Sequence, residues 1–341
     1  MLKLIQNYSY FFILFFSTIN FLQAPDVTYS SGTTLTSDLR LSLSQRAIFN
    51  ATLTLNGAGF FYDFPITSDL VLLVNNGFTA TLQNLLLRNF STSNLSLGTG
   101  SNIIFGDKTV LQILFDQSLT QTLKFSGNSI ISGKENIIDM GTGIISVQSN
   151  SNLKIQNLNF INLTNLNFGC VDNSGSITFE NVSLSIPTRL NWANGSFLVS
   201  RRMEILGGGV FGYTSGMSST IDNNSKLILS SNVTFSYDPV KLSGQAVAGS
   251  TNLNFTSTSS WLYLAGCNLF VTSTGLSLRK GSLTVENRNL LFSDATISAS
   301  QGLCFGDGIN INNDFQISDF NALSNNITVS SGIMTYQNIE T

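Results

Sequence analysis

The sequence of 341 residues contains no histidine, and charged residues make up only 10% of it. Without imidazole the chain cannot form a Ser-His-Asp or Cys-His triad, nor a metal site that depends on histidine. The formal net charge of -3 leaves no broad basic surface for phosphates, so we expect no nucleic acid partner. We interpret the one dense basic spot, Arg201 and Arg202, as a solvated loop or edge pair.

Cysteine is also scarce. Cys170, Cys267 and Cys304 have no close spacing, and their odd number leaves at least one thiol free. Each lies next to glycine or an apolar residue, which indicates small buried hydrophobic side chains. No CxxC pair of the zinc type occurs, so we expect no metal site and no cofactor.

Hydrophobic residues make up 42% of the chain, and Ser, Asn, Thr and Gly dominate the remainder. Sparse charge with many hydroxyl and amide groups favours β-structure with neutral polar faces, because long helices usually carry more Glu, Lys and Arg. The length allows one large domain or two ordinary ones, with a substantial core.

The amino terminus has the layout of a secretory signal peptide. Lys3 precedes an apolar stretch from residue 10 to residue 22, and the small residue Ala24 follows. Cleavage after Ala24 is uncertain because Leu22 is not small and Pro25 follows directly, so residues 1–24 are either a signal peptide or a retained anchor. We expect the protein to be exported, and therefore secreted or at the cell surface.

A repeated pattern runs along the chain. In "LKIQNLNFIN" (153–162) the alternation of apolar and polar residues is broken by Asn157 and resumes in the opposite phase, and "ITFENVSLSI" (177–186) repeats this around Asn181, 24 residues later. "ATLQNLLLRN" (80–89) superposes Asn84 on Asn157. Since a one-residue slip would turn buried side chains outward, each asparagine is predicted to mark a corner between two strands.

Segments of about 24 residues cannot bury an apolar face alone, but stacked copies can. We therefore predict an all-β parallel solenoid in which Asn84, Asn157 and Asn181 turn the chain through positive φ and hydrogen-bond to their counterparts in a ladder. A β-sandwich is the alternative, because short strands at regular spacing would give a similar pattern.

The stretch "NIIDMGTGIISVQSNSNLKIQNLNFINLTN" (136–165) resembles the coil consensus of the right-handed parallel β-helix, or pectin-lyase-like, superfamily. The two "FGD" turns at 105–107 and 305–307 and "TGLSLRKGSLTV" (274–285) are similar to repeats in uncharacterised bacterial secreted and surface proteins. The resemblance implies a right-handed β-helix, and these motifs specify a fold rather than a chemistry. We expect residues 25–50 to cap this helix and residues 51–341 to form it.

Acidic and aromatic residues supply the candidate chemistry. Five aspartates have Gly or Asn neighbours typical of turns: Asp107, Asp139, Asp172, Asp222 and Asp307. Asp116 and Asp139 are separated by about one coil and would be neighbours in a solenoid. Trp192, Trp261 and Tyr263 would either stack on a sugar or pack beneath a loop.

Two functions follow from these observations. The first is an exported, non-enzymatic solenoid, structural or adhesin-like, which contacts a glycan, a host-surface protein or other copies of itself at the coil ends. The second is a polysaccharide lyase or hydrolase on the same fold, which would need carboxylates converging in one groove. We favour the first, because the sequence lacks an evident catalytic constellation.

Overall fold

The computed structural model describes residues 25–41, 45–64, 71–230, 232–239, 249, 251–257 and 259–271, followed by the backbones of further strands between 276 and 340. The segment predicted to direct export, residues 1–24, lies outside the described residues. Among these, no helix is long and apolar enough to span a membrane.

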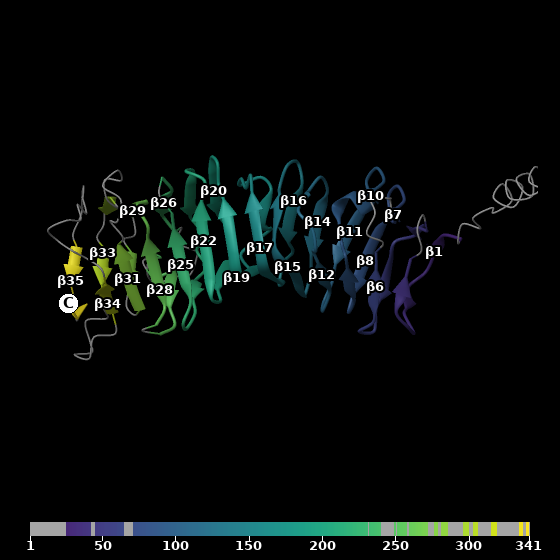
Figure 1. Ribbon diagram of the computed structural model, residues 1–341, viewed down its shortest axis with the longest axis horizontal. Coiled ribbons are helices and arrows are strands. Elements are labelled where there is room, and N and C mark those ends of the chain that lie inside the picture. Colours follow the sequence, from purple (N-terminus) through teal and green to yellow (C-terminus); the bar gives the residue numbers. More distant parts are fainter. Residues whose placement is uncertain are drawn as a thin grey trace, which may run out of the picture.

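Parallel strands stack into a β-solenoid of about nine turns of roughly 23 residues each. Each pairing between strands of successive turns is parallel. Figure 1 shows the turns side by side along one axis. The predicted parallel solenoid is confirmed, and the β-sandwich, which needs antiparallel sheets, is not formed.

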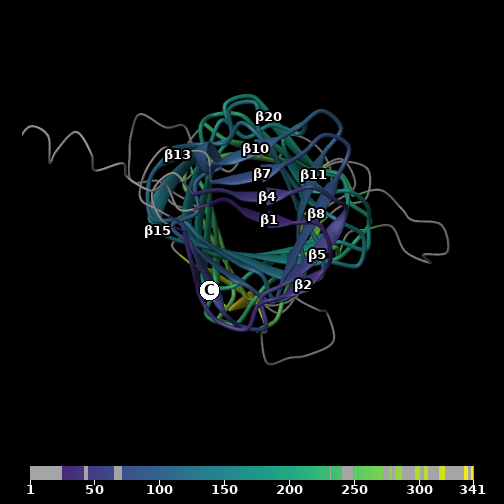
Figure 2. The ribbon, with the colours of Figure 1, turned by 90° about the vertical axis from the view of Figure 1, so that its right-hand side faces the viewer.

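The coil is right-handed. Figure 2 looks along the axis from the amino-terminal end, and the chain passes from β10 (Leu95–Leu97) at the top to β11 (Asn102–Phe105) on the right. It then reaches β13 (Gln117–Ser118) on the left. A clockwise path that recedes from the viewer is a right-handed one, which agrees with the usual hand of parallel crossovers.

The strands form five sheets, which we name A to E. Sheet A contains β1 (Val27–Tyr29), β4 (Ala47–Phe49), β7 (Leu72–Val74) and β10. Sheet B contains β2 (Thr33–Thr34), β5 (Leu53–Asn56), β8 (Thr79–Gln83), β11, β14 (Thr122–Phe125), β16 (Ile144–Val147) and β18 (Phe168–Cys170). Sheet D contains β20 (Arg189–Trp192), β23 (Val210–Tyr213), β26 (Thr234–Tyr237), β29 (Asn268–Val271) and β32 (Thr296–Ala299), and sheet E contains β30 (Leu276–Leu278), β33 (Leu303–Phe305) and β35 (Met334–Tyr336).

Sheet C follows the whole stack and bends into two arms. Its first strands are β3 (Leu39–Arg40), β6 (Phe61–Asp63), β9 (Leu86–Arg88), β12 (Val110–Gln112) and β13, followed by the long strands β15 (Asn128–Asp139), β17 (Asn152–Ile161) and β19 (Ser176–Ser185). The first halves of the long strands continue into β21 (Ser196–Val199), β24 (Ser219–Ile221) and β27 (Leu253–Phe255). Their second halves continue into the second arm, β22 (Arg202–Leu206), β25 (Lys226–Leu229), β28 (Trp261–Leu264), β31 (Gly281–Val285), β34 (Phe315–Ser318) and β36 (Ile339–Glu340).

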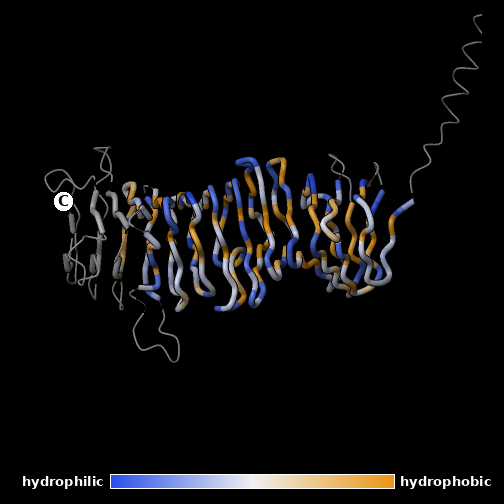
Figure 3. The backbone as a smooth tube through the Cα atoms, turned by 90° about the horizontal axis from the view of Figure 1, so that it is seen from below, coloured by the Kyte–Doolittle hydropathy of each residue, from blue (hydrophilic) through white to orange (hydrophobic). Residues whose placement is uncertain are grey.

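The core runs along the axis and is filled by every second side chain of each strand. Phe179 lies between Ile155 and Val199 in register, and all three are completely buried. Figure 3 shows hydrophobic and hydrophilic residues alternating along the turns. Because each turn covers the apolar face of the one before it, a single turn would have no stable core of its own.

Three predicted corner asparagines have positive φ: 53° at Asn84, 51° at Asn157 and 54° at Asn181. Asn181 Nδ2 donates to Asn157 Oδ1 at 3.0 Å, as a ladder requires. Asn84 lies at a different corner from these two, between β8 of sheet B and β9 of sheet C, and its Nδ2 donates to Asn56 Oδ1 at 3.4 Å. Asn89, which follows β9 and has φ 57°, takes the place that the sequence alignment gave to Asn84.

Residues 25–50, expected to form a cap, contribute strands β1 to β4 in the same parallel arrangement as the later turns. Val27 faces Ala47, and Ala47 in turn faces Leu72. A 3₁₀ turn, Thr92–Asn94, lies between β9 and β10.

Candidate functional site

Trp192 lies in the interior. It is 2% exposed, its Nε1 donates to the carbonyl oxygen of Gly195 at 3.3 Å, and its ring packs edge-on against Phe197 with centroids 5.3 Å apart. Leu190, two residues earlier on β20, is also buried, so the alternation of the strand directs both side chains inward. A ligand at the surface cannot reach this ring, and Trp192 is therefore packed in the core.

Trp261 and Tyr263 lie on the outer face of β28. Leu262 and Leu264 of the same strand are completely buried, whereas Trp261 is 40% exposed and Tyr263 is half-buried. Residues two apart on a strand are about 7 Å apart and share a face. The two rings are therefore neighbours on the second arm of sheet C.

Lys226 joins these rings from the preceding turn. It lies opposite Trp261 in the register of β25 and β28. Its Nζ is 4.6 Å from the centroid of the Trp261 ring and 5.0 Å from that of Tyr263. Both distances suit a cation–π interaction, worth about 0.5–1 kcal/mol at an exposed site, so Lys226 holds the rings in place.

The next strand, β22, adds an ion pair. Arg202 lies opposite Lys226, and its guanidinium donates to Glu204 Oε2 at 2.5 Å. Glu204 Oε1 also accepts a hydrogen bond from Ser230 Oγ at 2.7 Å. The carboxylate of Glu204 is thus engaged by Arg202, and the ammonium of Lys226 adds one further positive charge.

We call this group the aromatic–lysine surface. It consists of two outward rows on β22, β25 and β28, namely Arg202, Lys226 and Trp261 in one and Glu204, Ile228 and Tyr263 in the other. Neighbouring strands are about 4.8 Å apart, so the six side chains form a flat array on a rigid support.

A second ion-pair group lies at the bend of sheet C. Glu180 is paired with Lys154 at 2.7 Å and more loosely with Arg201 at 3.6 Å. The hydrogen bond from Lys154, aided by Gln156 and the charge of Arg201, holds the pKa of Glu180 below its usual value. The Arg201 side chain is 71% exposed and that of Arg202 is 54% exposed, as expected for a solvated pair.

A second aromatic–cation cluster lies on the first arm of sheet C. The guanidinium carbon of Arg88 is 3.8 Å from the centroid of the Phe61 ring, and that of Arg40 is 5.4 Å away. Asp63 lies between the two arginines in register and accepts a hydrogen bond from Asn89 at 3.0 Å. Here two cations flank one ring, whereas in the aromatic–lysine surface one cation is shared by two rings.

Four of the turn aspartates hold backbone amides, as expected. Asp139 accepts from the amide of Gly141, Asp172 from that of Ser174 and Asp222 from that of Asn223. Asp107 accepts from the amide of Asn128 in the next turn, which lowers the pKa of Asp107. Asp307 lies outside the described residues.

Asp116 and Asp139 do not form a pair of facing carboxylates. Asp139 lies opposite Ser118 in the register of β13 and β15. Asp116 accepts a hydrogen bond from the amide of Ile137 at 2.7 Å. Among the described residues, no group of three or more His, Cys, Asp or Glu side chains is arranged to hold a metal ion.

Two cysteines are free thiols whose burial raises the pKa to about 12, Cys170 and Cys267. They are therefore protonated at neutral pH and poor nucleophiles. The side chain of Cys304 lies outside the described residues.

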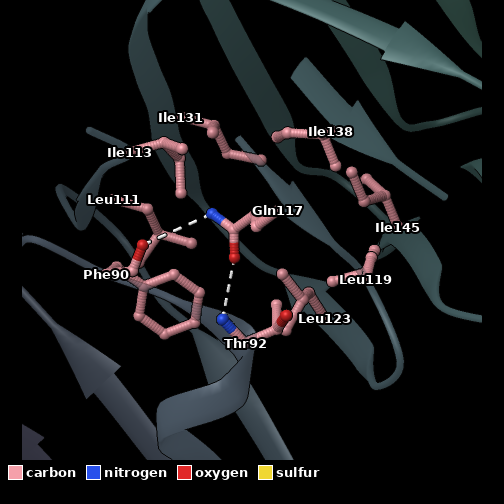
Figure 4. Close-up of a pocket in the computed structure, with 10 residues that line it drawn as sticks. All are labelled: Phe90, Thr92, Leu111, Ile113, Gln117, Leu119, Leu123, Ile131, Ile138 and Ile145. Atoms are coloured by element: carbon pink, nitrogen blue, oxygen red, sulfur yellow. Dashed lines mark hydrogen bonds between the residues drawn. The ribbon is translucent and has the colours of Figure 1, made fainter. Parts of the chain in front are cut away.

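The interior contains a small cavity between β12, β13 and β15 (Figure 4). Its lining is mostly aliphatic, and its free space of about 10 Å³ is about that of one water molecule. The amide of Gln117 accepts a hydrogen bond from Thr92 N at 2.8 Å and donates to Phe90 O at 3.4 Å. The cavity is too small for an organic ligand, so the candidate site is on the surface.

The fold defines the class of this chain, a right-handed parallel β-solenoid, and the outward aromatic–lysine surface is its most distinctive chemical feature. Comparison of the chain with protein-family models, with curated proteins and with solved structures found no match. A function must therefore be argued from the surface itself.

Proposed function

We propose that the protein is an exported, non-enzymatic solenoid that displays a glycan-binding surface, in the manner of an adhesin. The observation that carries the proposal is the pair of outward rings, Trp261 and Tyr263, fixed by Lys226 on a flat face of sheet C. An exposed indole costs little to keep on a rigid support and offers a large apolar face to the C–H groups of a pyranose.

Export is part of the proposal and depends on the signal-like segment of residues 1–24. The relation to pectin-lyase-like proteins, and to bacterial secreted and surface proteins, is likewise a proposal supported by the motif at 136–165 and by the parallel coil. We propose this relation as one of architecture.

A lyase or hydrolase would need carboxylates that converge on one groove. Among the described residues, Asp116, Asp139 and the turn aspartates are engaged with backbone amides along different edges of the stack. These observations favour binding over cleavage.

Association with a second copy at the ends of the stack stays a prediction. It is supported by β1, β2 and β3, each of which pairs with a single strand among the described residues. Free parallel edges are sites at which another chain can add a strand.

The proposal is tested by measuring binding of the purified full chain to an array of immobilised glycans, for wild type and Trp261→Ala. We expect wild type to bind at least one glycan class and Trp261→Ala to bind it about tenfold more weakly, as loss of an aromatic stacking contact predicts. Phe270→Ala is the matched control, because Phe270 is 38% exposed on sheet D, away from the surface.

Absence of glycan binding by wild type, or equal binding by Trp261→Ala, would contradict the proposal. Binding to a host-surface protein that persists after glycans are removed would identify a protein partner instead. Release of unsaturated or shortened sugars from a polysaccharide would show an enzyme. Circular dichroism of each variant checks that the β-structure is retained.

A further inference from the structure

We infer that Lys226 makes the aromatic–lysine surface selective for glycans whose pyranose rings carry an anionic group, either a sulfate ester or a carboxylate. This inference rests on the proposed glycan-binding function and adds the chemical class of the ligand.

The first observation concerns the partners of Lys226. Two other lysines on outer strand faces donate to protein oxygens: Lys154 to Glu180 at 2.7 Å and Lys124 to Asn102 Oδ1 at 2.6 Å. Lys226 instead contacts two ring faces, and no acceptor oxygen for its ammonium is present among the described residues. Ring faces attract the charge but fill none of the three N–H donor positions as an oxygen would, so these donors are available to a ligand.

The second observation concerns the surrounding charges. Glu204, the carboxylate on the same face, is engaged by Arg202 and by Ser230. Arg202 lies directly opposite Lys226 and is positively charged. Tyr263 is an uncharged phenol at neutral pH. Arg202, Glu204 and Lys226 together carry one net positive charge, on a protein whose formal net charge is -3.

The third observation is the position of this charge relative to the rings. The ammonium is 4.6 Å from the centre of the Trp261 ring and one strand away along the axis. A pyranose stacked on Trp261 would therefore bring a substituent on its edge within reach of Lys226. A charge-assisted hydrogen bond forms when the oxygen is about 2.8 Å from the nitrogen, and both sulfate and carboxylate oxygens can form it.

A neutral sugar would use the same ring but would leave the ammonium without an anion. The preference for an anionic ligand is thus expected to come from Lys226, and the stacking energy from Trp261. The two contributions can be separated because one side chain is removed at a time.

The experiment compares matched ligands that differ only in charge, with the full chain as the protein. Dextran sulfate is compared with dextran, and 3′-sialyllactose with lactose, by calorimetry or by surface binding. We expect wild type to bind the anionic member of at least one pair about tenfold more tightly than the neutral member. A preference in the first pair identifies sulfate esters, and in the second pair carboxylates.

Lys226→Met removes the charge and keeps an apolar side chain of similar length. It is expected to bring the affinities for the anionic and neutral members to within about twofold of each other. Lys226→Arg retains the positive charge and is expected to retain the preference. Thermal unfolding of each variant at the wild-type temperature shows that the fold is unchanged.

The inference is overturned if wild type binds both members of each pair equally, or if Lys226→Met keeps the preference. Equal binding that is still lost in Trp261→Ala would leave the proposed glycan-binding function intact and remove only the selectivity. Absence of binding to all four ligands and to the glycan array would remove both.

Discussion

The central turns of the solenoid, residues 144–206, are built differently from the amino-terminal turns, residues 25–125. In the centre, β17 and β19 have 10 residues each and bend at one asparagine, with both halves of each strand in register. In the amino-terminal turns, the strands have two to five residues. A single residue with positive φ therefore redirects a strand while its hydrogen bonds continue on both sides of the bend.

Register offsets show the consequence of this difference. In the centre, Asn128, Asn152 and Ser176 follow one another at intervals of 24 residues. Nearer the amino terminus, Phe61 pairs with Leu86 and Val110 with Ile130, which are offsets of 25 and 20 residues. Where single asparagines make the bends the length of a turn is fixed, and where longer corners make them it varies. The interior cavity lies where the two kinds of turn meet.

The largest expected effect compares the two interiors. Phe179→Ala in the centre should lower the free energy of unfolding by about 3–5 kcal/mol, because the side chain is completely buried. Phe105→Ala should cost a similar amount in the amino-terminal turns, where Phe105 is completely buried and stacked on Phe125 at 5.3 Å. Urea unfolding measures both, and a cost below about 1 kcal/mol for Phe105→Ala alone would show a looser amino-terminal core.

The boundary between the regions is tested by Gln117→Leu. This change removes the acceptor of Thr92 N and the donor to Phe90 O, so we expect a loss of about 1–3 kcal/mol in the free energy of unfolding. Val110→Thr on the outer side of β12 is the control, since Val110 is only partly buried. An unchanged free energy of unfolding in Gln117→Leu would mean that water replaces the amide in the cavity.

The corners are tested by substitutions at Asn181 and Asn84. Asn181→Ala should cost about 1–2 kcal/mol, since alanine is strained at positive φ. Asn181→Gly relieves that strain and removes the bond to Asn157 Oδ1, so its smaller cost isolates the ladder. The same pair of variants at Asn84 measures the amino-terminal corner. Equal stability of the Ala and Gly variants at either position would contradict the strain explanation.

The smallest expected effect concerns pH. Lys154 lowers the pKa of Glu180 below its ordinary value of 4.5, so the stabilisation is present above the unfolded pKa and is lost as pH falls through the folded one. Glu180→Gln should therefore destabilise the protein by less than about 1 kcal/mol at pH 7, and the difference from wild type should vanish near pH 3, at about the folded pKa or below. Urea midpoints at several pH values give the comparison, and a difference that grows on acidification would have the wrong sign.

The sequence was sufficient to predict the parallel stack, because the apolar set of residues moves with the asparagine from Asn157 to Asn181. It was not sufficient to place Asn84. Two corners of one turn are each followed by apolar residues, and the local pattern around Asn84 and Asn89 does not distinguish them. Only the strand register does.

The site was predicted in part. The spacing of Leu190 and Trp192 already carried the signal that Trp192 faces the core, whereas the contact of Lys226 with Trp261 carried none. These two residues are 35 apart in the sequence, well beyond the 24-residue repeat, because the turn between them is longer. A periodic alignment therefore cannot bring them together.

The hydrogen bonds between successive turns of the solenoid have a mechanical consequence. They run along the axis, so tension applied to the two ends acts on the outermost turn first, and the remaining turns stay covered by their neighbours. We expect the rod to lengthen in steps as it is pulled, with each turn of roughly 23 residues releasing about 80 Å of chain. A protein that holds a surface against flow would then yield gradually, one lap at a time, before it parts.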